Sequence, residues 1–429
     1  MKLQDYLRFR RIKNKTFAKF LNISPVSLSR YISGERFPEK KILIKIHNLS
    51  EESKPILVKY DFKKILTDYS YNDFVNRHTD YPGFWKYLPL LPINSSNSII
   101  DLGELITPLI KINVTKFPKN SKIFVKDEGR LPTGSFKARG LALAVAKAKE
   151  FGIQKMAIPT NGNAGAALAA YASKANIESI VLCPDDTPKI NINEAALQGA
   201  KTIVVNGLIN ECGKIINDLR DEMGWFDVST LKEPYRIEGK KTMGFELFEQ
   251  FNKSLPDAIF YPTGGGTGLI GMWKAFHELK ELGWLNCKLP KMFAIQSETC
   301  APIVQAFENN QRHAELWKNA NTIASGIRVP AAIGDFLILD AVRESGGSAI
   351  AVSEESIIDF RDAISNESGL LMCPEGAATA AGYIKALSMK LINENDQVVL
   401  FNCASGLKYP MPKITDKINK DNFSKKDFN

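Results

Sequence analysis

The chain has 429 residues, of which 44% are hydrophobic, 24% charged and 10% aromatic, with 29 glycines and 21 prolines. At ~150 residues per domain this length predicts two or three domains, and the composition excludes collagen-like and broadly disordered chains. No apolar run approaches the roughly 20 residues that span a bilayer. Six scattered cysteines and four histidines argue against a disulfide scaffold or a zinc site, so we expect a cytoplasmic protein without membrane contact or bound metal.

The positive charge is concentrated at the amino-terminal end. Residues 1–50 contain 12 Lys and Arg but 3 Asp and Glu, so this segment accounts for the whole formal net charge of +9. The rest of the chain has 44 basic and 44 acidic residues. This partition indicates a small module that binds a polyanion, attached to a neutral body.

Residues 1–55 are predicted to form a domain of short helices. Ser24 is a favourable N-cap and Pro25 suits the first turn, so a helix is expected to begin there. The apolar spacing of Phe17, Ala18, Leu21, Ile23, Leu28 and Tyr31 resembles the helix-turn-helix of the Cro and phage-repressor type. By this resemblance Pro25–Ile32 is a recognition helix, and the residues that contact DNA are Ser24, Val26, Ser27, Ser29 and Arg30. A helical domain that has lost DNA binding, or that only forms dimers, is the alternative.

The remaining chain is predicted to be α/β. Residues 56–105 are expected to form an irregular connecting segment over the following domain, since free linkers are poor in aromatic residues. From about residue 121, short apolar runs alternate with alanine-rich helical patterns, which favours a largely parallel sheet. Strands are expected at 123–125, 156–158, 180–182, 202–205, 259–261, 293–295 and 398–401, and helices at 141–150 and 164–174. Residues 413–429 are expected to form a mobile polar tail.

Three glycine-containing segments each adjoin a predicted strand or the start of a predicted helix. Pro132–Gly140 contains Lys137, which can lose its proton among apolar neighbours and act as a nucleophile. In Thr160–Gly165 and Thr263–Gly268, backbone N–H groups at a helix start favour a carboxylate or phosphate. Together these segments meet the needs of a pyridoxal phosphate enzyme: a Schiff-base lysine, a phosphate cradle and a turn that binds the amino-acid carboxylate.

The motifs resemble those of fold-type II pyridoxal phosphate enzymes, specifically the threonine synthase family. The similarity extends from about Trp85 to Pro410 and includes the stretches 107–109, 230–243, 374–378 and 405–408. The resemblance implies a fold like the tryptophan synthase β subunit, with the catalytic domain at residues 106–412 and a smaller subdomain inserted at roughly 140–245. It also implies a homodimer.

Carried over by position, the resemblance implies a role for each motif. Lys137 would bind pyridoxal 5'-phosphate as a Schiff base and move protons, and Asn163 would contact the ring oxygen of the cofactor. The cofactor phosphate would be held by Gly264, Gly265, Gly266, Thr267 and Gly268. The substrate carboxylate would lie at Thr160, Asn161 and Gly162, and a substrate phosphate near Ser135 and Arg139. The pyridine nitrogen would face Cys403, where family members commonly have Thr, with Ser405 as a second candidate.

The activity implied by the resemblance is conversion of O-phospho-L-homoserine and water to L-threonine and phosphate. Two other enzymes would use the same cofactor: a serine/threonine dehydratase and a cysteate-synthase-like enzyme. A third alternative is a transcriptional regulator that uses the pyridoxal phosphate body as a sensor. The basic amino-terminal segment and Cys403 keep regulation open, whereas Lys137 and the glycine loop favour catalysis.

Overall fold

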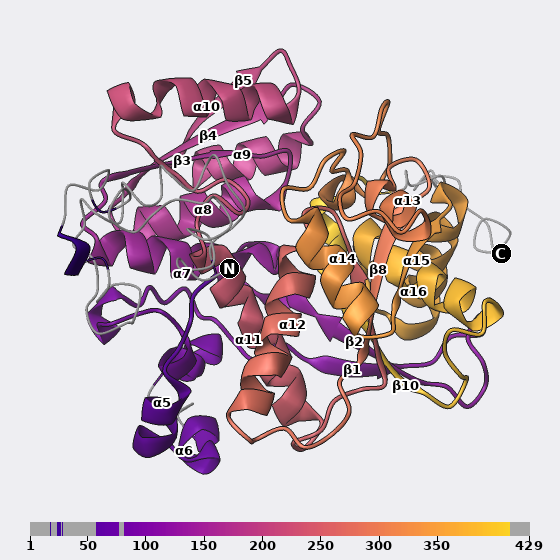
Figure 1. The fold of residues 1–429 in the computed structure, drawn as a ribbon. Coiled ribbons are helices and arrows are strands. Elements are labelled where there is room, and N and C mark those ends of the chain that lie inside the picture. Colours follow the sequence, from indigo (N-terminus) through magenta and orange to yellow (C-terminus); the bar gives the residue numbers. More distant parts are fainter. Residues whose placement is uncertain (1–17, 19–23, 27, 29–56, 77–80, 412–429) are drawn as a thin grey trace, which may run out of the picture.

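The computed structural model describes residues 18, 24–26, 28, 57–76 and 81–411. Two sheets organise these residues: a six-stranded sheet of order β1-β2-β10-β7-β8-β9 and a four-stranded sheet of order β5-β4-β3-β6. Every pairing is parallel except that of β1 with β2. The two sheets and their helices form two lobes, at the upper left and the right of Figure 1. The strands and helices expected from residue 121 onward are confirmed.

The larger sheet separates two apolar layers. Its strands are β1 (Leu109–Ile112), β2 (Lys122–Asp127), β7 (Ala258–Pro262), β8 (Lys291–Ser297), β9 (Ser348–Val352) and β10 (Gln397–Asn402). On β7, Phe260 packs with α15 (Glu354–Ser368) and α16 (Pro374–Ser388), whereas Tyr261 belongs to the cluster that contains α13 (Pro302–Glu308) and α14 (Asp335–Glu344). Successive side chains of a strand point to opposite faces, so these helices cover the two sides of the sheet.

The smaller sheet is also covered on both faces. Its strands are β3 (Lys155–Pro159), β4 (Glu178–Pro184), β5 (Lys201–Val205) and β6 (Phe226–Asp227). On β3, Met156 and Ile158 pack into the main core with α8 (Asn163–Lys174), whereas Ala157 packs with α10 (Ile209–Met223). Helix α9 (Lys189–Leu197) lies against α8 and β5.

Three long helices meet between the sheets: α7 (Lys137–Glu150), α11 (Tyr235–Gln250) and α12 (Thr267–Glu281). Helix α11 packs against both of the others. Glycine makes the close approach possible, because a Cβ on Gly239 would lie 2.1 Å from the carbonyl oxygen of Arg139. A Cβ on Gly271 would lie 3.0 Å from that of Ile237. The amino-terminal turns of the three helices therefore converge.

The segment that precedes the first sheet is more regular than expected. It contains α5 (Phe62–Asp68), α6 (Tyr71–Val75) and two 3₁₀ helices, η2 (Gly83–Leu90) and η3 (Ser96–Ser98). Its aromatic residues pack on α11: the ring centroids of Phe74 and Tyr87 lie 6.0 Å and 5.4 Å from that of Phe245. Burial of aromatic side chains against a helix explains why this stretch is ordered despite its polar composition.

Few residues of the predicted helix-turn-helix are described. Pro25, Val26 and Leu28 are helical, Ala18 and Leu28 are buried, and Ser24 and Val26 are exposed. The predicted DNA contacts Ser27, Ser29 and Arg30 lie outside the described residues, as does the tail at 413–429. DNA binding therefore stays a prediction.

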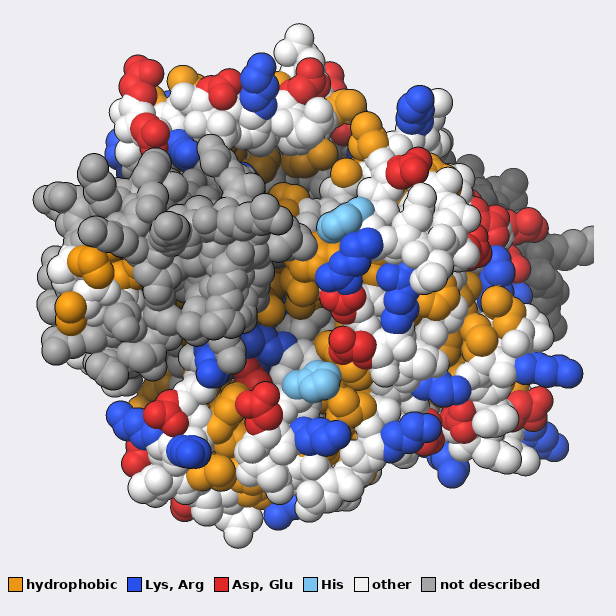
Figure 2. All heavy atoms as spheres, in the orientation of Figure 1, with side chains coloured by type: hydrophobic (Ala, Val, Ile, Leu, Met, Phe, Trp, Pro, Cys, Tyr) orange, Lys and Arg blue, Asp and Glu red, His pale blue; other side chains and the backbone are white. Residues whose placement is uncertain are grey.

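Charged side chains of both signs are interspersed over the face shown in Figure 2. This mixture agrees with the equal numbers of basic and acidic residues beyond residue 50. In the part of the chain that the structure describes, no helix has the length and apolar character needed to cross a membrane.

Candidate active site

The predicted site segments meet at the carboxyl ends of strands. The lysine segment follows β2 and runs beside the segment after β10, where Ser135 and Ala404 form an antiparallel bridge. The N–H of Phe136 donates to the carbonyl of Cys403 at 3.0 Å, and the N–H of Ser405 donates to the carbonyl of Gly134 at 2.8 Å. Ligands of open α/β folds bind at such strand ends, which makes this region the candidate site.

Lys137 begins helix α7 directly after a strained turn. Thr133 and Gly134 both have left-handed backbone angles, with φ of 60° and 61°. The Lys137 Nζ lies 4.7 Å from the centre of the Phe136 ring. Burial and the nearby Arg236 guanidinium lower the pKa of Lys137 to about 8. About a tenth of this amine is therefore unprotonated at pH 7, far more than for an ordinary lysine, and the unprotonated form is the nucleophile.

The glycine loop after β7 packs closely against neighbouring side chains. A Cβ on Gly266 would lie 2.2 Å from Ile338 Cδ1, and one on Gly268 would lie 1.8 Å from the Tyr261 hydroxyl. Larger residues therefore cannot occupy these positions without displacing their neighbours. The loop leads into the amino terminus of α12 at Thr267, where unpaired N–H groups and the helix dipole favour a phosphate.

The turn after β3 presents a second helix amino terminus. Thr160 Oγ1 accepts a hydrogen bond from the N–H of Gly162 at 3.2 Å, which closes the turn before α8. Asn161 is half-buried within this turn. At the first position of α8, Asn163 Nδ2 donates to the Tyr409 hydroxyl at 3.4 Å. This geometry suits a carboxylate at the turn and a polar ligand atom at Asn163.

Several buried polar atoms near these segments have no hydrogen-bond partner in the protein: Thr133 Oγ1, Ser135 Oγ, Asn163 Oδ1, Glu233 Oε1 and Arg236 Nε. Buried polar atoms are rarely left unpaired, so a group of them indicates a ligand site. The residues present fit the pyridoxal phosphate that the sequence implies: a lysine amine for its aldehyde, a glycine loop for its phosphate and polar atoms for its ring.

Cys403 is buried at the end of β10. Burial raises the pKa of its thiol, which is therefore neutral at physiological pH. A neutral thiol is a weak donor and acceptor. Ser405 Oγ accepts a hydrogen bond from the N–H of Leu407 at 3.3 Å and so caps a short 3₁₀ helix, η7 (Gly406–Lys408).

The expected contact of Arg139 with a substrate phosphate is wrong. Its guanidinium is fully buried and forms ion pairs with Glu128 at 2.6 Å and Glu246 at 2.5 Å. It also donates to Thr242 and Thr107, so all of its N–H groups are engaged. Arg139 is the third residue of α7, two positions after Lys137, and helical positions two apart do not share a face.

Sequence reasoning missed three charged residues of the site, on or just before α11. Arg236 donates to the carbonyl of Val228 at 2.7 Å, and Lys240 donates to Thr267 Oγ1 at 2.8 Å. Glu233 accepts from the N–H of Arg236 at 3.1 Å, and burial raises its pKa to about 7. The stretch 230–243 marked the family resemblance, but its charges are typical of an exposed helix, so no role was assigned to them.

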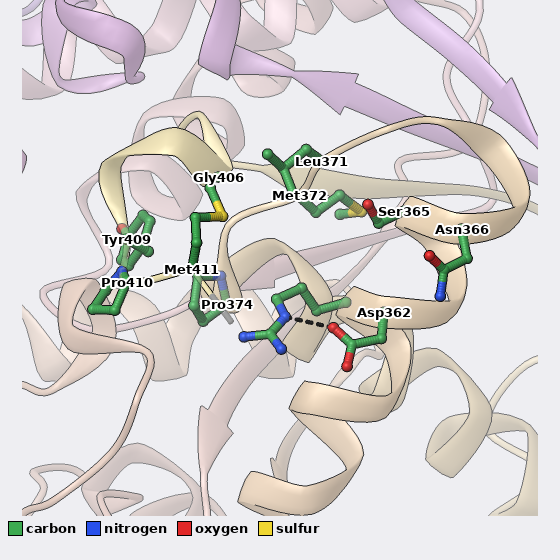
Figure 3. Close-up of a pocket in the computed structure, with 11 residues that line it drawn as sticks. Asp362, Ser365, Asn366, Leu371, Met372, Pro374, Gly406, Tyr409, Pro410 and Met411 are labelled. Carbon is green, nitrogen blue, oxygen red and sulfur yellow. Dashed lines mark hydrogen bonds and ion pairs between the residues drawn. The ribbon is translucent and has the colours of Figure 1, made fainter. Parts of the chain in front are cut away.

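A separate cavity of about 310 Å³ lies beside α15 and the segment 406–411 (Figure 3). Its lining includes the Arg361–Asp362 ion pair of 2.8 Å and Tyr409, but none of the predicted site residues. Tyr409 connects the two regions, since its hydroxyl accepts the hydrogen bond from Asn163. The cavity therefore adjoins the candidate site without being part of it.

Comparison with known proteins agrees with this geometry. The model of the family described as pyridoxal-phosphate dependent enzyme matches residues 100–404. The chain is 33% identical over 353 residues to a threonine synthase of Methanocaldococcus jannaschii, covering 82% of this chain and 86% of that protein. It is 34% identical over 357 residues to one of Methanosarcina acetivorans, covering 83% and 86%.

Solved structures share the fold at lower identity. The processed form of threonine deaminase isoform 2 from Solanum lycopersicum has a TM-score of 0.60 and 17% identity, and covers 82% of this chain and 92% of its own. Maize serine racemase has a TM-score of 0.60 and 20% identity, with 70% and 88% covered. These similarities establish the α/β fold and carry no information about the substrate.

Proposed function

Because the chain belongs to the pyridoxal-phosphate dependent enzyme family and is a carbon–oxygen lyase that requires this cofactor, we propose that it is a threonine synthase. The reaction converts O-phospho-L-homoserine and water to L-threonine and phosphate. The observation that carries the proposal is the similarity to threonine synthases through more than four fifths of the chain. The arrangement of Lys137, the glycine loop and the turn at Thr160 supports it.

Lys137 is assigned two tasks in this reaction. It holds the cofactor until the amino group of the substrate replaces it, and its freed amine then moves protons at Cα and Cβ of the substrate. Its pKa of about 8 suits a group that must both accept and donate a proton near neutral pH. When bound, the cofactor withdraws electrons from the substrate α-carbon. The proton removed from Cβ is balanced by one delivered to Cγ, from which phosphate leaves. The hydroxyl of water is added at Cβ, and the remaining proton of water leaves with the phosphate.

The remaining residues bind and orient the reactants. The substrate carboxylate binds at the turn Thr160–Gly162 and the amino terminus of α8. Asn163 contacts the ring oxygen of the cofactor. With Arg139 fully engaged, Arg236 is the buried guanidinium that still has an unpaired N–H, at Nε. We assign it to the substrate phosphate, together with the Ser135 hydroxyl, which is also buried and unpaired.

A coupled assay tests the substrate. Purified protein loaded with pyridoxal 5'-phosphate is incubated with O-phospho-L-homoserine, and phosphate and threonine are measured together. The proposal requires equal amounts of both products and none from the Lys137→Ala variant. Formation of 2-oxo acids from L-serine or L-threonine, without phosphate release from O-phospho-L-homoserine, would instead identify a dehydratase.

We also propose that residues 1–55 form a DNA-binding module on a homodimeric enzyme. The supporting observation is the concentration of the whole net charge of +9 in residues 1–50. A dimer would present two such modules, with half-sites about one helical turn, ~34 Å, or a multiple of it apart. Binding should weaken steeply with salt, with log K falling by roughly 0.9 per phosphate contacted for each log unit of salt.

Gel-shift measurements on genomic fragments from the source organism, including the region upstream of the gene, test this module. Full-length protein should shift a subset of fragments, and a variant lacking residues 1–50 should shift none while it still binds cofactor. Equal behaviour of the two proteins would contradict the DNA-binding role and leave oligomerisation as the explanation. The dimer itself is checked by light scattering on the full chain.

A further inference from the structure

Lys240 lies beside the glycine loop without an acidic partner. Its side chain is fully buried on α11, and its Nζ donates a 2.8 Å hydrogen bond to Oγ1 of Thr267, the first residue of α12. The Nζ is also 5.3 Å from the centre of the Phe136 ring, the residue that precedes the nucleophile. Lys240 takes part in none of the ion pairs formed by the described residues. Its amine therefore lies at the glycine loop with only a hydroxyl and an aromatic ring as partners.

The next residue of the helix shows what a buried lysine normally requires. Lys241 is equally buried, but its Nζ lies 2.7 Å from Glu238 and 2.8 Å from Glu278. Buried charges are found paired because an unpaired one loses its hydration without compensation. The contrast between adjacent lysines on one helix indicates that the counter-charge of Lys240 is not supplied by the protein.

The surroundings of Lys240 favour an anion strongly. The amino-terminal turns of α7, α11 and α12 converge there, and each contributes the positive end of a helix dipole. Lys137 and Arg236 add positive charge, and together with burial they lower the pKa of Lys240 well below its usual range. The carboxylate of Glu233 acts in the opposite direction, but it forms no ion pair with Lys240 in the described part of the chain. An anion with more than one charge would relieve this repulsion.

We propose that Lys240 is a side-chain ligand of the cofactor phosphate, adding a positive charge to the backbone N–H groups of the glycine loop. A phosphate monoester carries a charge of about −1.5 to −2 at neutral pH, which matches a site of converging dipoles and one ammonium. Its position against Thr267 selects Lys240 over Arg236, which bonds the carbonyl of Val228 instead. The inference depends on the cofactor and is independent of which amino acid is the substrate.

Apoprotein titrations with two aldehydes test the assignment. Pyridoxal 5'-phosphate and pyridoxal both react with Lys137, but only the first carries a phosphate, so the difference between their affinities isolates the phosphate contact. In Lys240→Met we expect the dissociation constant of pyridoxal 5'-phosphate to rise by about tenfold to a hundredfold, the range for a hydrogen bond between charged groups. That of pyridoxal should change less than about twofold. Lys280→Met, which removes an exposed lysine at the far end of α12, is the matched control and should change neither constant.

Thermal unfolding of the apoprotein separates this role from a structural one. Loss of an unpaired buried amine should leave the midpoint of Lys240→Met unchanged or raise it, since Met fills a similar volume without a charge. A lower midpoint, with both aldehydes weakened equally, would overturn the proposal. So would unchanged affinity for pyridoxal 5'-phosphate with a raised KM for O-phospho-L-homoserine, which would assign Lys240 to the substrate phosphate.

A second variant keeps the test decisive if Lys240→Met does not fold. Lys240→Gln retains a donor for Thr267 but removes the charge, so it should also weaken binding of pyridoxal 5'-phosphate more than binding of pyridoxal. Equal affinity of this variant and the unaltered protein for pyridoxal 5'-phosphate would show that the ammonium is not a ligand.

Discussion

Helices α7 and α11 carry two buried clusters of charge that differ in one respect. In the first, Arg139 of α7 and Glu246 of α11 join Glu128 and Lys126, and the guanidinium has an acceptor for every N–H. In the second, Lys137 of α7 and two cations of α11 have unpaired atoms or no acidic partner. Both clusters are buried and charged. They differ in pairing: the N–H groups of Arg139 all have acceptors in the cluster that stabilises the fold, whereas polar atoms lack partners in the proposed ligand site.

Ionisation behaves oppositely in the two clusters. Burial opposes the charge of Glu246, but Arg139 and Lys126 overcome it and hold the pKa of Glu246 at about 2. Burial opposes the charge of Lys137 as well, and there the neighbouring Arg236 adds to the effect and lowers the pKa to about 8. Glu246 is therefore ionised at neutral pH, whereas Lys137 can exchange protons, which is the property a catalytic group needs.

The largest effect is expected from Lys137→Ala. This change removes the amine that holds the cofactor, so the protein should lose the visible absorbance of a protonated imine and all measurable turnover. Because Lys137 has no partner charge and its burial opposes protonation, its removal should leave the free energy of unfolding of the apoprotein near neutral pH unchanged or raise it. Absorbance spectra, phosphate release and urea unfolding provide the three measurements. Cofactor that remains covalently attached in this variant would refute the assignment.

Arg139→Met breaks the complete cluster instead. It leaves Glu128 and Glu246 buried without their main counter-charge, which should cost about 3–5 kcal/mol of unfolding free energy. Arg130→Met is the control: its side chain is 61% exposed and pairs with Asp127, so its loss should cost about 1 kcal/mol or less. Equilibrium urea unfolding measures both. Full stability of Arg139→Met with a raised KM for the phosphorylated substrate would restore Arg139 as a substrate ligand.

The pH dependence of cofactor capture sharpens the comparison. Only the neutral amine of Lys137 attacks an aldehyde, and its pKa is lowered to about 8. The rate at which apoprotein captures pyridoxal should therefore rise about tenfold per pH unit below 8 and level off above it. Stopped-flow absorbance between pH 6 and 9.5 records the profile. A midpoint near the usual lysine value of about 10.4 would contradict the lowered pKa.

The lowered pKa of Lys137 should also make the stability of the apoprotein depend on pH. A lysine whose pKa is lowered in the folded state is neutral there while it is still protonated in the unfolded chain. Unfolding then takes up a proton between about pH 8 and the unfolded value, so stability should rise with pH through that window. Lys137→Ala should abolish this rise.

The smallest effect is expected from Cys403→Thr. The two side chains are similar in volume and Cys403 is neutral and buried, so stability should change by less than about 1.5 kcal/mol. A hydroxyl is a stronger hydrogen-bond partner than a thiol, so threonine formation should be preserved or increased. Steady-state kinetics at saturating cofactor measure it. A large loss of activity would mean that the thiol is required.

Much of the fold follows from local patterns in the chain. Each expected strand is present because runs such as 258–262 are apolar along their whole length, as central parallel strands are. Lys137 and the glycine loop were also recognisable, because a reactive lysine and a row of glycines are each placed against a neighbouring strand or helix. The segment 62–90 was less predictable, since its helices depend on aromatic packing against Phe245.

By itself the sequence determined the α/β class, the cofactor motifs and the uneven distribution of charge, since all three depend on residues close together in the chain. Tertiary structure alone decided which charges are paired. Arg139 and Glu246 are 107 positions apart, and Lys240 and Thr267 are 27 apart. In a sequence, a basic residue that pairs with a distant buried carboxylate cannot be distinguished from one that has no such partner. The packing of α11 on α7 and α12 places Arg139 beside two carboxylates and leaves Lys137, Arg236 and Lys240 without an ion-pair partner among the described residues.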